Sequence, residues 1–299
     1  MNIQGFTGVI RAPFLLLTPM CVLLGIAVAV WEGRAIDAAA AALVMIGALA
    51  AHISVNALNE YFDFKSGLDL RTLKTPFSGG SGTLVENPEF ARPALLTGVI
   101  ALAVTLLIGL WFLLQRGWAL LPIGLLGIAI IAGYTHWINR NRFLCLVAPG
   151  AGFGPLMVLG SYYVLTGTVS ISAVATSLIP FFLVNNLLLL NQFPDVEADR
   201  SVGRENFPIY YGLESSVNLH GLFMLCAFLV LPVAILFEWL PWYVMLAAPL
   251  ALLAVATTAG ARRAGEDIEQ LLPHMRSNVL VALITPLLVS IALLISPLQ

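Results

Sequence analysis

The chain has 299 residues, of which 60% are hydrophobic and only 10% are charged, and its formal net charge is −2. Soluble domains carry roughly 25% charged residues, so most of this surface is expected to face lipid. A slightly acidic chain also lacks the basic field that a nucleic-acid-binding protein needs, which excludes that class. The three cysteines lie far apart in apolar stretches and indicate neither a disulfide framework nor a zinc site.

Stretches without Asp, Glu, Lys or Arg that are long enough to cross a membrane occupy most of the chain. A transmembrane helix needs about 20 apolar residues, and apolarity without alternation disfavours a β-barrel. The longest stretch, 143–194, has room for two helices. We therefore predict an all-α integral membrane protein, a single bundle of nine transmembrane helices that forms one domain over residues 1–299. The predicted helices are 12–31, 38–59, 93–115, 117–139, 143–165, 171–193, 215–237, 239–261 and 277–297.

The basic residues fall mostly on one side of this bundle. Twelve of the fourteen Lys and Arg lie before the first helix or in the loops after the even-numbered helices, and only Arg34 and Arg116 lie on the other side. Because Lys and Arg concentrate in cytoplasmic loops, we expect the N-terminus in the cytoplasm and the C-terminus outside. The first helix lacks a signal-peptide pattern and is expected to stay in the protein.

Two of the cytoplasmic loops, about 60–91 and 195–213, are long, and with their borders they hold ten of the sixteen Asp and Glu. The first acidic cluster starts on the second helix, where a spacing of 4, 3 and 4 places four polar residues on one helical face. These residues are His52, Asn56, Asn59 and Asp63. Gly67 then allows a turn that brings Asp69 back towards Asp63.

The second acidic cluster follows the sixth helix, where Asn191, Asp195 and Asp199 are spaced 4 and 4. Taken singly, such residues are usually solvated loop charges or interhelical amide contacts, but two carboxylate-rich clusters on the same side favour a joint site. Carboxylate oxygens suit Mg²⁺, which usually keeps phosphate in its coordination shell. The pattern therefore predicts a metal-bridged diphosphate site.

Basic side chains in the same region can bind phosphate oxygens. They are Lys65, Arg71, Lys74, Arg140, Arg142, Arg200 and Arg204. The segment 78–82, Ser-Gly-Gly-Ser-Gly, either offers backbone N–H groups to an anion or is a plain flexible loop.

The two clusters together resemble the UbiA superfamily of intramembrane prenyltransferases. Within it, the stretches 61–67, 154–163 and 199–204 look most like the 1,4-dihydroxy-2-naphthoate polyprenyltransferases of menaquinone synthesis. The chain departs from the usual motifs at Glu60, which keeps a carboxylate but lengthens its reach, at Pro194, where Arg is frequent, and at Arg204, where Lys is common.

The resemblance implies a UbiA-like bundle in a prokaryotic plasma (inner) membrane, with cytoplasmic loops that cap the active site. It implies that the partners are an isoprenyl diphosphate donor, an aromatic acceptor and the surrounding membrane lipid, and that no nucleic acid is bound. The residues implied to be catalytic and to bind Mg²⁺ are Asp63, Asp69, Asp195 and Asp199, supported by Asn59 and Asn191. Aromatic faces can stabilise an allylic cation. The candidates are Tyr61, Phe62, Tyr134, Tyr162 and Tyr163, with core packing as the alternative for each.

Other functions fit parts of the same pattern. A different acceptor or a terpene cyclase activity is compatible with the same superfamily. A secondary transporter is the alternative from another class, because polar residues in duplicated halves also mark transport sites, although the acids here lie at the cytoplasmic helix ends and not at the midplane. A CDP-alcohol phosphotransferase would need an Asp-Gly…Ala-Arg pattern that the sequence lacks.

Overall fold

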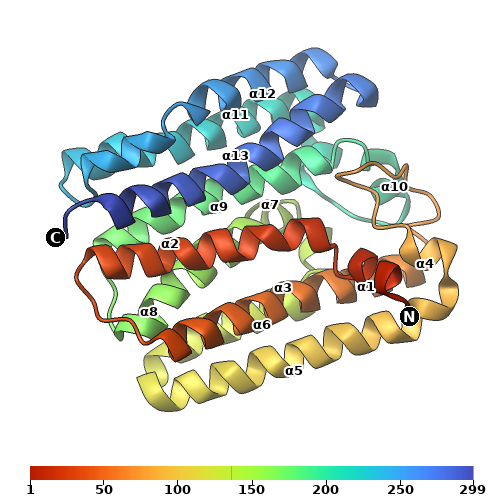
Figure 1. Ribbon diagram of the computed structural model, residues 1–299. Coiled ribbons are helices and arrows are strands. Elements are labelled where there is room, and N and C mark those ends of the chain that lie inside the picture. The colour runs from red at the N-terminus through yellow and green to blue at the C-terminus, as the bar shows by residue number, and fades with distance from the viewer. Residues whose placement is uncertain (136, 299) are drawn as a thin grey trace.

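The computed structural model describes residues 1–135 and 137–298, in which every regular element is helical. The long helices run along a common direction and form a single bundle (Figure 1). The N-terminus, α4 and α10 lie at one end of the bundle, and the C-terminus lies at the other (Figure 1). We call the first of these the loop end, because the long connections 67–90 and 192–206 lie there.

The α-helices are α1 (Ile3–Val9), α2 (Leu17–Trp31), α3 (Ala38–Ser66), α4 (Thr83–Glu86), α5 (Ala91–Arg116), α6 (Leu121–Gly133), α7 (Arg142–Ala151), α8 (Gly160–Thr166), α9 (Ile171–Asn191), α10 (Val196–Ser201), α11 (Phe207–Leu236), α12 (Leu250–Ala264) and α13 (Ile268–Ile295). Short 3-10 helices are η1 (Ala12–Leu16), η2 (Pro88–Phe90), η3 (Trp118–Leu120), η4 (Ile138–Arg140) and η6 (Trp242–Ala247), and η5 (Gly152–Leu159) is a π-helix.

Within the described residues, eight helical segments are long and apolar enough to cross a membrane. They are Ala12–Trp31, Ala38–Ser66, Pro88–Arg116, Arg142–Thr166, Ile171–Asn191, Phe207–Leu236, Trp242–Ala264 and Ile268–Ile295. The expected helix 117–139, whose residue 136 lies outside the described part, contains a shorter apolar helix, Trp118–Gly133. The all-helical, multi-span fold is therefore confirmed, whereas the count of nine crossings stays a prediction.

Several helices continue beyond the apolar stretches that predict them. The helix expected at 38–59 runs to Ser66, where Gly67 closes it with a left-handed φ of 76°. The helix expected at 277 begins at Ile268, where the Asp267 side chain accepts a hydrogen bond from a backbone N–H of the first turn. The helix expected at 215 follows Gly212, whose non-helical backbone (φ 80°, ψ 168°) separates it from a short first segment of α11 that begins at Phe207 and is capped by Asn206. Absence of charge marks the membrane-embedded part of a helix, but capping residues decide where it ends.

The span Arg142–Thr166 is irregular, with α7 and α8 joined by the π-helix η5. Pro149 and Pro155 each remove a backbone N–H donor, which explains the departure from α-helical bonding. A Cβ on Gly150 would collide with the carbonyl oxygen of Phe181 on α9, so glycine allows this span to pack closely against α9.

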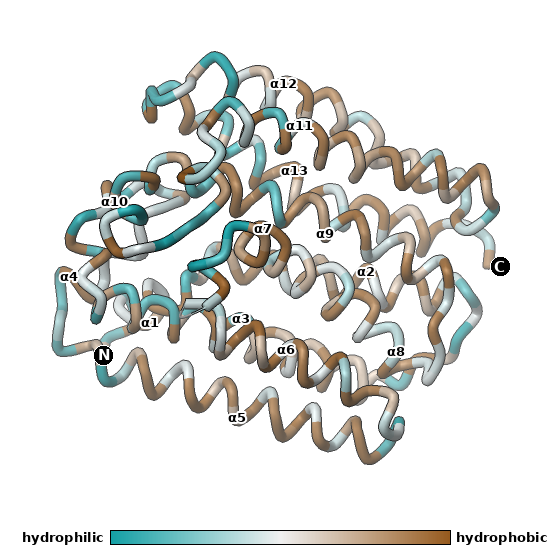
Figure 2. Tube along the Cα trace, turned by 180° about the vertical axis from the view of Figure 1, so that it is seen from behind, coloured by the Kyte–Doolittle hydropathy of each residue, from teal (hydrophilic) through white to brown (hydrophobic). Residues whose placement is uncertain are grey.

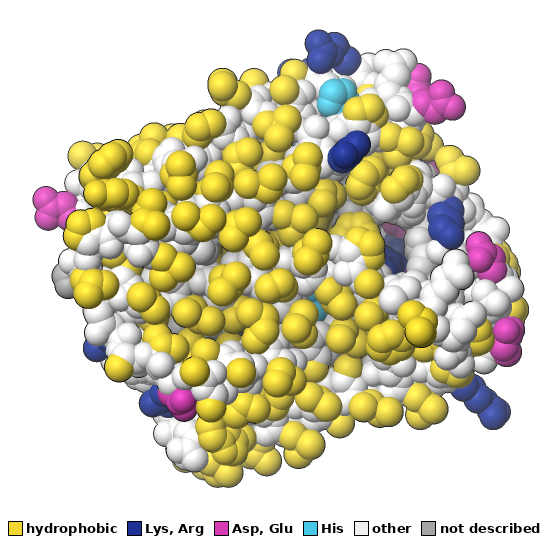
Figure 3. Space-filling model, in the orientation of Figure 1, with side chains coloured by type: hydrophobic (Ala, Val, Ile, Leu, Met, Phe, Trp, Pro, Cys, Tyr) yellow, Lys and Arg dark blue, Asp and Glu magenta, His cyan; other side chains and the backbone are white. Residues whose placement is uncertain are grey.

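The main core lies between α2, α9, α11 and α13, and is made of buried aliphatic side chains such as Leu24, Leu183, Leu231 and Val289. Hydrophobic residues continue along the lengths of the helices, while hydrophilic residues gather at the loop end (Figure 2). Hydrophobic side chains also cover the outer face between the two ends, and most of the charged side chains visible there lie near the ends (Figure 3). An apolar exterior over an apolar core is the arrangement expected of a protein surrounded by lipid.

Candidate active site

A cavity of about 580 Å³ begins at the loop end and extends into the bundle. Figure 3 shows a hollow near the loop end with acidic and basic side chains inside it. Along α3 the cavity wall extends from Asp63 to Val44, a distance of about 28 Å at 1.5 Å per residue. Carboxylates and amides line the end near Asp63, whereas the deeper wall is formed by Leu, Ile and Gly of α5 and α6. The cavity therefore joins a charged site to a long apolar channel.

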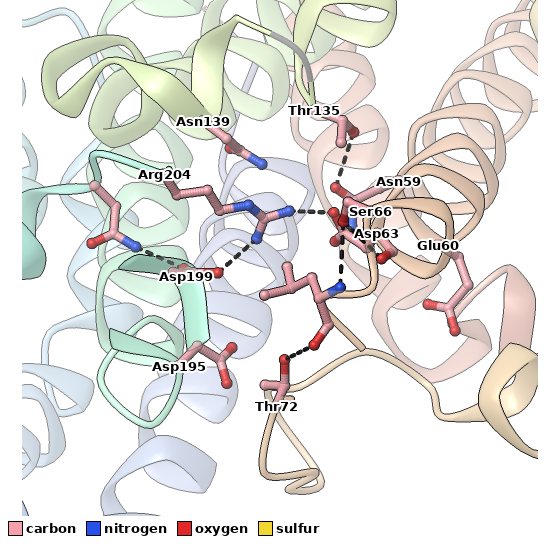
Figure 4. Close-up of polar contacts among 12 residues, drawn as sticks. Asn59, Glu60, Asp63, Ser66, Thr72, Thr135, Asn139, Asp195, Asp199 and Arg204 are labelled. Carbon is pink, nitrogen blue, oxygen red and sulfur yellow. Dashed lines mark hydrogen bonds and ion pairs between the residues drawn. The ribbon is translucent and has the colours of Figure 1, made fainter. Parts of the chain in front are cut away.

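The polar face predicted for α3 does face this cavity. His52, Asn56, Asn59 and Asp63 all line it. The Asn59 amide donates to Asp63 Oδ2 at 2.8 Å, and the Thr135 hydroxyl donates to Asn59 Oδ1 at 3.2 Å (Figure 4). Asn59 thus orients one oxygen of Asp63 and is itself held by the segment after α6.

Arg204 lies between the two acidic clusters (Figure 4). Its guanidinium donates to Asp63 Oδ1 and, at 2.9 Å, to Asp199 Oδ1, while Asn206 donates to Asp199 Oδ2 at 2.8 Å. Burial alone would lower the pKa of Arg204, but Asp63 and Asp199 raise it well above its usual value. The first and second clusters are therefore brought together, as predicted, with a permanent cation between them.

Asp69 and Asp195 complete the acidic group. Asp69 Oδ2 and Asp195 Oδ1 are buried and have no hydrogen-bond partner among the described residues. Burial, reinforced by Glu60 and Asp63, raises the pKa of Asp69 to about 7. Burial and the neighbouring Asp199 raise the pKa of Asp195 to about 7, although the Gly79 N–H donates to its Oδ2 at 3.2 Å. The positive charges of Arg11 and Arg204 offset only part of this rise in either carboxylate.

These residues suit a divalent cation by chemistry. Buried carboxylate oxygens without partners are the hard donors that Mg²⁺ prefers. Within the described part of the chain, no three His, Cys, Asp or Glu side chains are grouped tightly enough to hold an ion as they stand. A cation would therefore compete with Arg204 for Asp63 and Asp199.

Glu60 forms hydrogen bonds to two segments next to the site, the one around Arg11 and the loop 78–82. Its side chain is fully buried and accepts from the guanidinium of Arg11 at 3.2 and 3.3 Å, from the Ser81 N–H at 3.2 Å and from the Ser81 hydroxyl. The glycines around Ser81 make this possible, because Gly80 has a left-handed φ of 71° and a Cβ there would lie 2.8 Å from Asp69 Oδ1. Two N–H groups of the segment 78–82, those of Gly79 and Ser81, thus bind carboxylates of the protein itself.

Arg11 lines the cavity and was not predicted as a site residue. Its position directly before the first apolar helix is the one sequence signal that could have identified it. The other basic residues expected at the site lie elsewhere, since among the described cavity walls only Arg204 of that set appears. Two of them lie against aromatic rings, Lys65 over Tyr61 and Arg142 over Tyr210. Two form ion pairs, Lys74 with Glu86 and Arg200 with Glu197. The guanidinium of Arg71 donates a hydrogen bond to the Ser201 hydroxyl, and Arg140 is exposed.

Of the tyrosines considered, only Tyr134 is among the described cavity-lining residues. Tyr61 packs edge-on against the ring of Phe62. Tyr162 is completely buried in the main core, and its hydroxyl donates to Glu32. The structure therefore favours core packing for Tyr162. The sequence did not show this, because the direction in which a helix face points is set by the neighbouring helices against which it packs.

Among the polar residues that line the cavity without having been predicted, three form a hydrogen-bonded group: Asn139 on η4, Cys145 on α7, and Gln192 directly after α9. The Gln192 amide donates to Cys145 Sγ at 3.2 Å, and the Cys145 thiol donates to Asn139 Oδ1 at 3.5 Å. Gln192 adjoins the predicted Asn191, but nothing in the sequence relates Asn139 to the two acidic clusters. All three lie near Arg204 because the loops fold together.

The sequence model of the UbiA prenyltransferase family matches residues 18–280. The chain is 29% identical over 170 residues to the 1,4-dihydroxy-2-naphthoate octaprenyltransferase of Bacillus subtilis (strain 168), a match that covers 56% of this chain and about half, 53%, of that protein. It is 26% identical over 257 residues to the protein of the same name from Escherichia coli (strain K12), covering 83% and 82%.

Solved structures of UbiA homologues share the fold. The apo structure of a homologue from Aeropyrum pernix K1 has a TM-score of 0.69 at 16% identity and covers 92% of this chain and 96% of that chain. A homologue from Archaeoglobus fulgidus, bound to DMAPP and Mg²⁺, has a TM-score of 0.60 at 14% identity, covering 97% and 99%.

Proposed function

The chain belongs to the UbiA prenyltransferase family, and on that basis we propose that it transfers a prenyl group from an isoprenyl diphosphate to an aromatic acceptor inside the membrane, in a Mg²⁺-dependent reaction. The observation that carries this proposal is the cavity, which joins buried carboxylates and Arg204 to a long apolar channel. The names of the curated relatives favour a 1,4-dihydroxy-2-naphthoate-like acceptor in quinone biosynthesis.

At the charged end, the four carboxylates would hold Mg²⁺: Asp63, Asp69, Asp195 and Asp199. When bound, the ion would neutralise charge that develops on the leaving diphosphate. Arg204 adds a fixed positive charge beside the same oxygens, and its planar guanidinium suits two phosphate oxygens at once. The segment 78–82, fastened by Glu60, would cover the site and limit the access of water.

Along the channel, aliphatic side chains would hold the hydrocarbon tail and shield the allylic cation from water. The ring of Tyr134 lies in the cavity wall and can stabilise a cation through its face. An electron-rich acceptor ring then attacks the cation and loses a proton, and in the naphthoate subfamily the ring also loses its carboxyl group. Among the described residues that line the channel deeper in the bundle, none is charged, as a hydrocarbon site requires.

We further propose that the loop end faces the cytoplasm of a prokaryotic inner membrane, since twelve of the fourteen Lys and Arg fall on that side of the predicted topology. A secondary transporter is less consistent with the geometry. Asp63 lies in the last turn of α3, and the other carboxylates and Arg204 lie in the long connections at the loop end, whereas transport sites lie near the bilayer midplane.

The test uses the purified full-length protein with Mg²⁺, prenyl diphosphates of several lengths and a panel of aromatic acceptors. Diphosphate release and product mass are measured together. We expect Asp63→Asn and Asp195→Asn to abolish both signals, and the exposed-site control Glu197→Gln to retain them. Full activity of either Asp variant, or substrate uptake by proteoliposomes without diphosphate release, would overturn the proposal.

A further inference from the structure

The cavity wall near Arg204 carries neutral polar side chains that neither a diphosphate nor a prenyl tail requires. Asn139 and Cys145 are 5% and 3% exposed, and Gln192 lines the cavity beside them. A diphosphate is bound by cations and charged donors, and a hydrocarbon chain makes no hydrogen bonds. This wall is therefore chemically suited to a third ligand.

The hydrogen bonds within this wall are weak ones. Gln192 donates to the sulfur of Cys145, whose thiol in turn is 3.5 Å from Asn139 Oδ1. A thiol is a poor donor and a poor acceptor, so both amides would gain strength by bonding to an oxygen instead. The neighbouring Asn191 also lines the cavity, and its buried Oδ1 has no partner among the described residues. A ligand hydroxyl could donate to that oxygen and relieve the cost of leaving it unpaired.

The position of these side chains places a ligand beside the diphosphate-binding end. The Glu205 N–H donates to the Asn139 carbonyl oxygen at 3.2 Å, which ties η4 to the residue after Arg204. Figure 4 shows the Asn139 side chain next to the Arg204 side chain. Tyr134, which also lines the cavity, supplies a ring against which a flat ligand can stack.

We propose that this wall is the acceptor site and that it recognises a hydroxylated aromatic ring. The set consists of Tyr134, Asn139, Cys145, Asn191 and Gln192, which we call the amide recess. A ring hydroxyl donates to Asn191 Oδ1 and accepts from the Gln192 amide, while the face of the ring lies on Tyr134. Amides supply donors and acceptors without charge, which matches phenolic hydroxyls. The inference rests on the proposed function and adds the residues that select the acceptor.

The first test follows the thiol of Cys145. With Cys21→Ala and Cys226→Ala, Cys145 is the remaining cysteine of the chain. We expect 1,4-dihydroxy-2-naphthoate alone, without prenyl diphosphate, to slow alkylation of Cys145 by N-ethylmaleimide several-fold. The matched control carries Cys145→Ala and Ser161→Cys in that background, because Ser161 lines the cavity from α8. Its thiol should be protected by geranyl diphosphate with Mg²⁺ and not by the acceptor.

The second test separates the two substrates kinetically. Gln192→Met keeps the length of the side chain and removes its hydrogen bond, so KM for the acceptor should rise about tenfold, while KM for the prenyl diphosphate stays unchanged. Gln115→Met, at the exposed far end of α5, should change neither value.

Three results would overturn the inference. They are an unprotected Cys145 in a preparation that still makes product, an equal rise in both KM values in Gln192→Met, and an unchanged KM for the acceptor. If N-ethylmaleimide does not alkylate the Cys145 thiol under any condition, the KM values of Gln192→Met alone decide whether the inference holds. Absence of any prenylated product with every acceptor would instead refute the proposed function itself, and the inference with it.

Discussion

Arg204 offers the sharpest test of how the acidic site works, because its guanidinium occupies the two carboxylates that a metal ion needs. Asp63 and Asp199 have side chains only 6% and 5% exposed. Arg204→Gln would leave both carboxylates buried without a cation, although Asn59 and Asn206 would still donate to them. Removing one partner of a buried ion pair costs about 3–5 kcal/mol.

For a chain of this size, that cost corresponds to a Tm lowered by about 10 °C in the absence of metal. Mg²⁺ would restore most of the loss, because the neutral amide of the variant no longer competes for the carboxylates. Each charge-assisted hydrogen bond of Arg204 is worth about 1.5–3 kcal/mol, so the apparent affinity for Mg²⁺ should rise by about tenfold or more. Activity should nevertheless fall, since the diphosphate loses a cationic partner.

The assay is thermal unfolding of the purified protein in detergent, in EDTA and across a Mg²⁺ titration, with calorimetry for the Mg²⁺ affinity. Arg200→Gln is the matched control, because Arg200 is exposed and pairs only at the surface with Glu197. A Tm in EDTA equal to that of the wild type, or weaker Mg²⁺ binding by Arg204→Gln, would refute the view that Arg204 competes with the metal ion.

Three further outcomes are expected. The pKa values of Asp69 and Asp195 are about 7 in the folded protein, against about 3.9 for an unfolded Asp. The folded state therefore binds more protons, and the contribution of these protons to stability is lost as pH rises from about 4 to 7. Mg²⁺ should therefore raise Tm more at pH 8 than at pH 6, and an equal or larger rise at pH 6 would contradict this. Glu60→Gln should release the segment 78–82, which limited proteolysis would detect as faster cleavage there, while Glu86→Gln, an exposed partner of Lys74, should cleave at the wild-type rate. Gly124→Leu should favour short prenyl diphosphates over long ones in turnover assays. Gly124 lines the channel, and no heavy atom of the described residues lies within 4 Å of a Cβ there, so a larger side chain would fill space that the tail needs. Gly124→Ala should show a smaller change, and an unaltered length preference would place the tail elsewhere.

The charge distribution of the sequence was sufficient to predict the membrane fold and the end of the bundle at which the two acidic clusters meet. Six of the eight long spans match a charge-free stretch of their own, and the other two share the stretch 143–194, where the π-helical irregularity of the first was not predicted. The spacing of His52, Asn56, Asn59 and Asp63 predicted the face that lines the cavity. The charge-free stretches and the residue spacing are both local properties of the sequence. A helix repeats every 3.6 residues, and lipid excludes charge along the whole embedded length of a helix.

Only the tertiary structure decided which side chains reach the site. The Arg11–Glu60 pair joins residues 49 positions apart, and the Gln192–Cys145 contact joins residues 47 positions apart. Tyr162, which lies on a predicted helix, turns into the core, and most of the loop cations stay at the surface. Periodicity fixes a face relative to its own helix axis, but the direction of that face depends on the neighbours against which the helix packs. Loops have no periodicity at all, so the place of a charge along the chain does not show whether it meets solvent or the site.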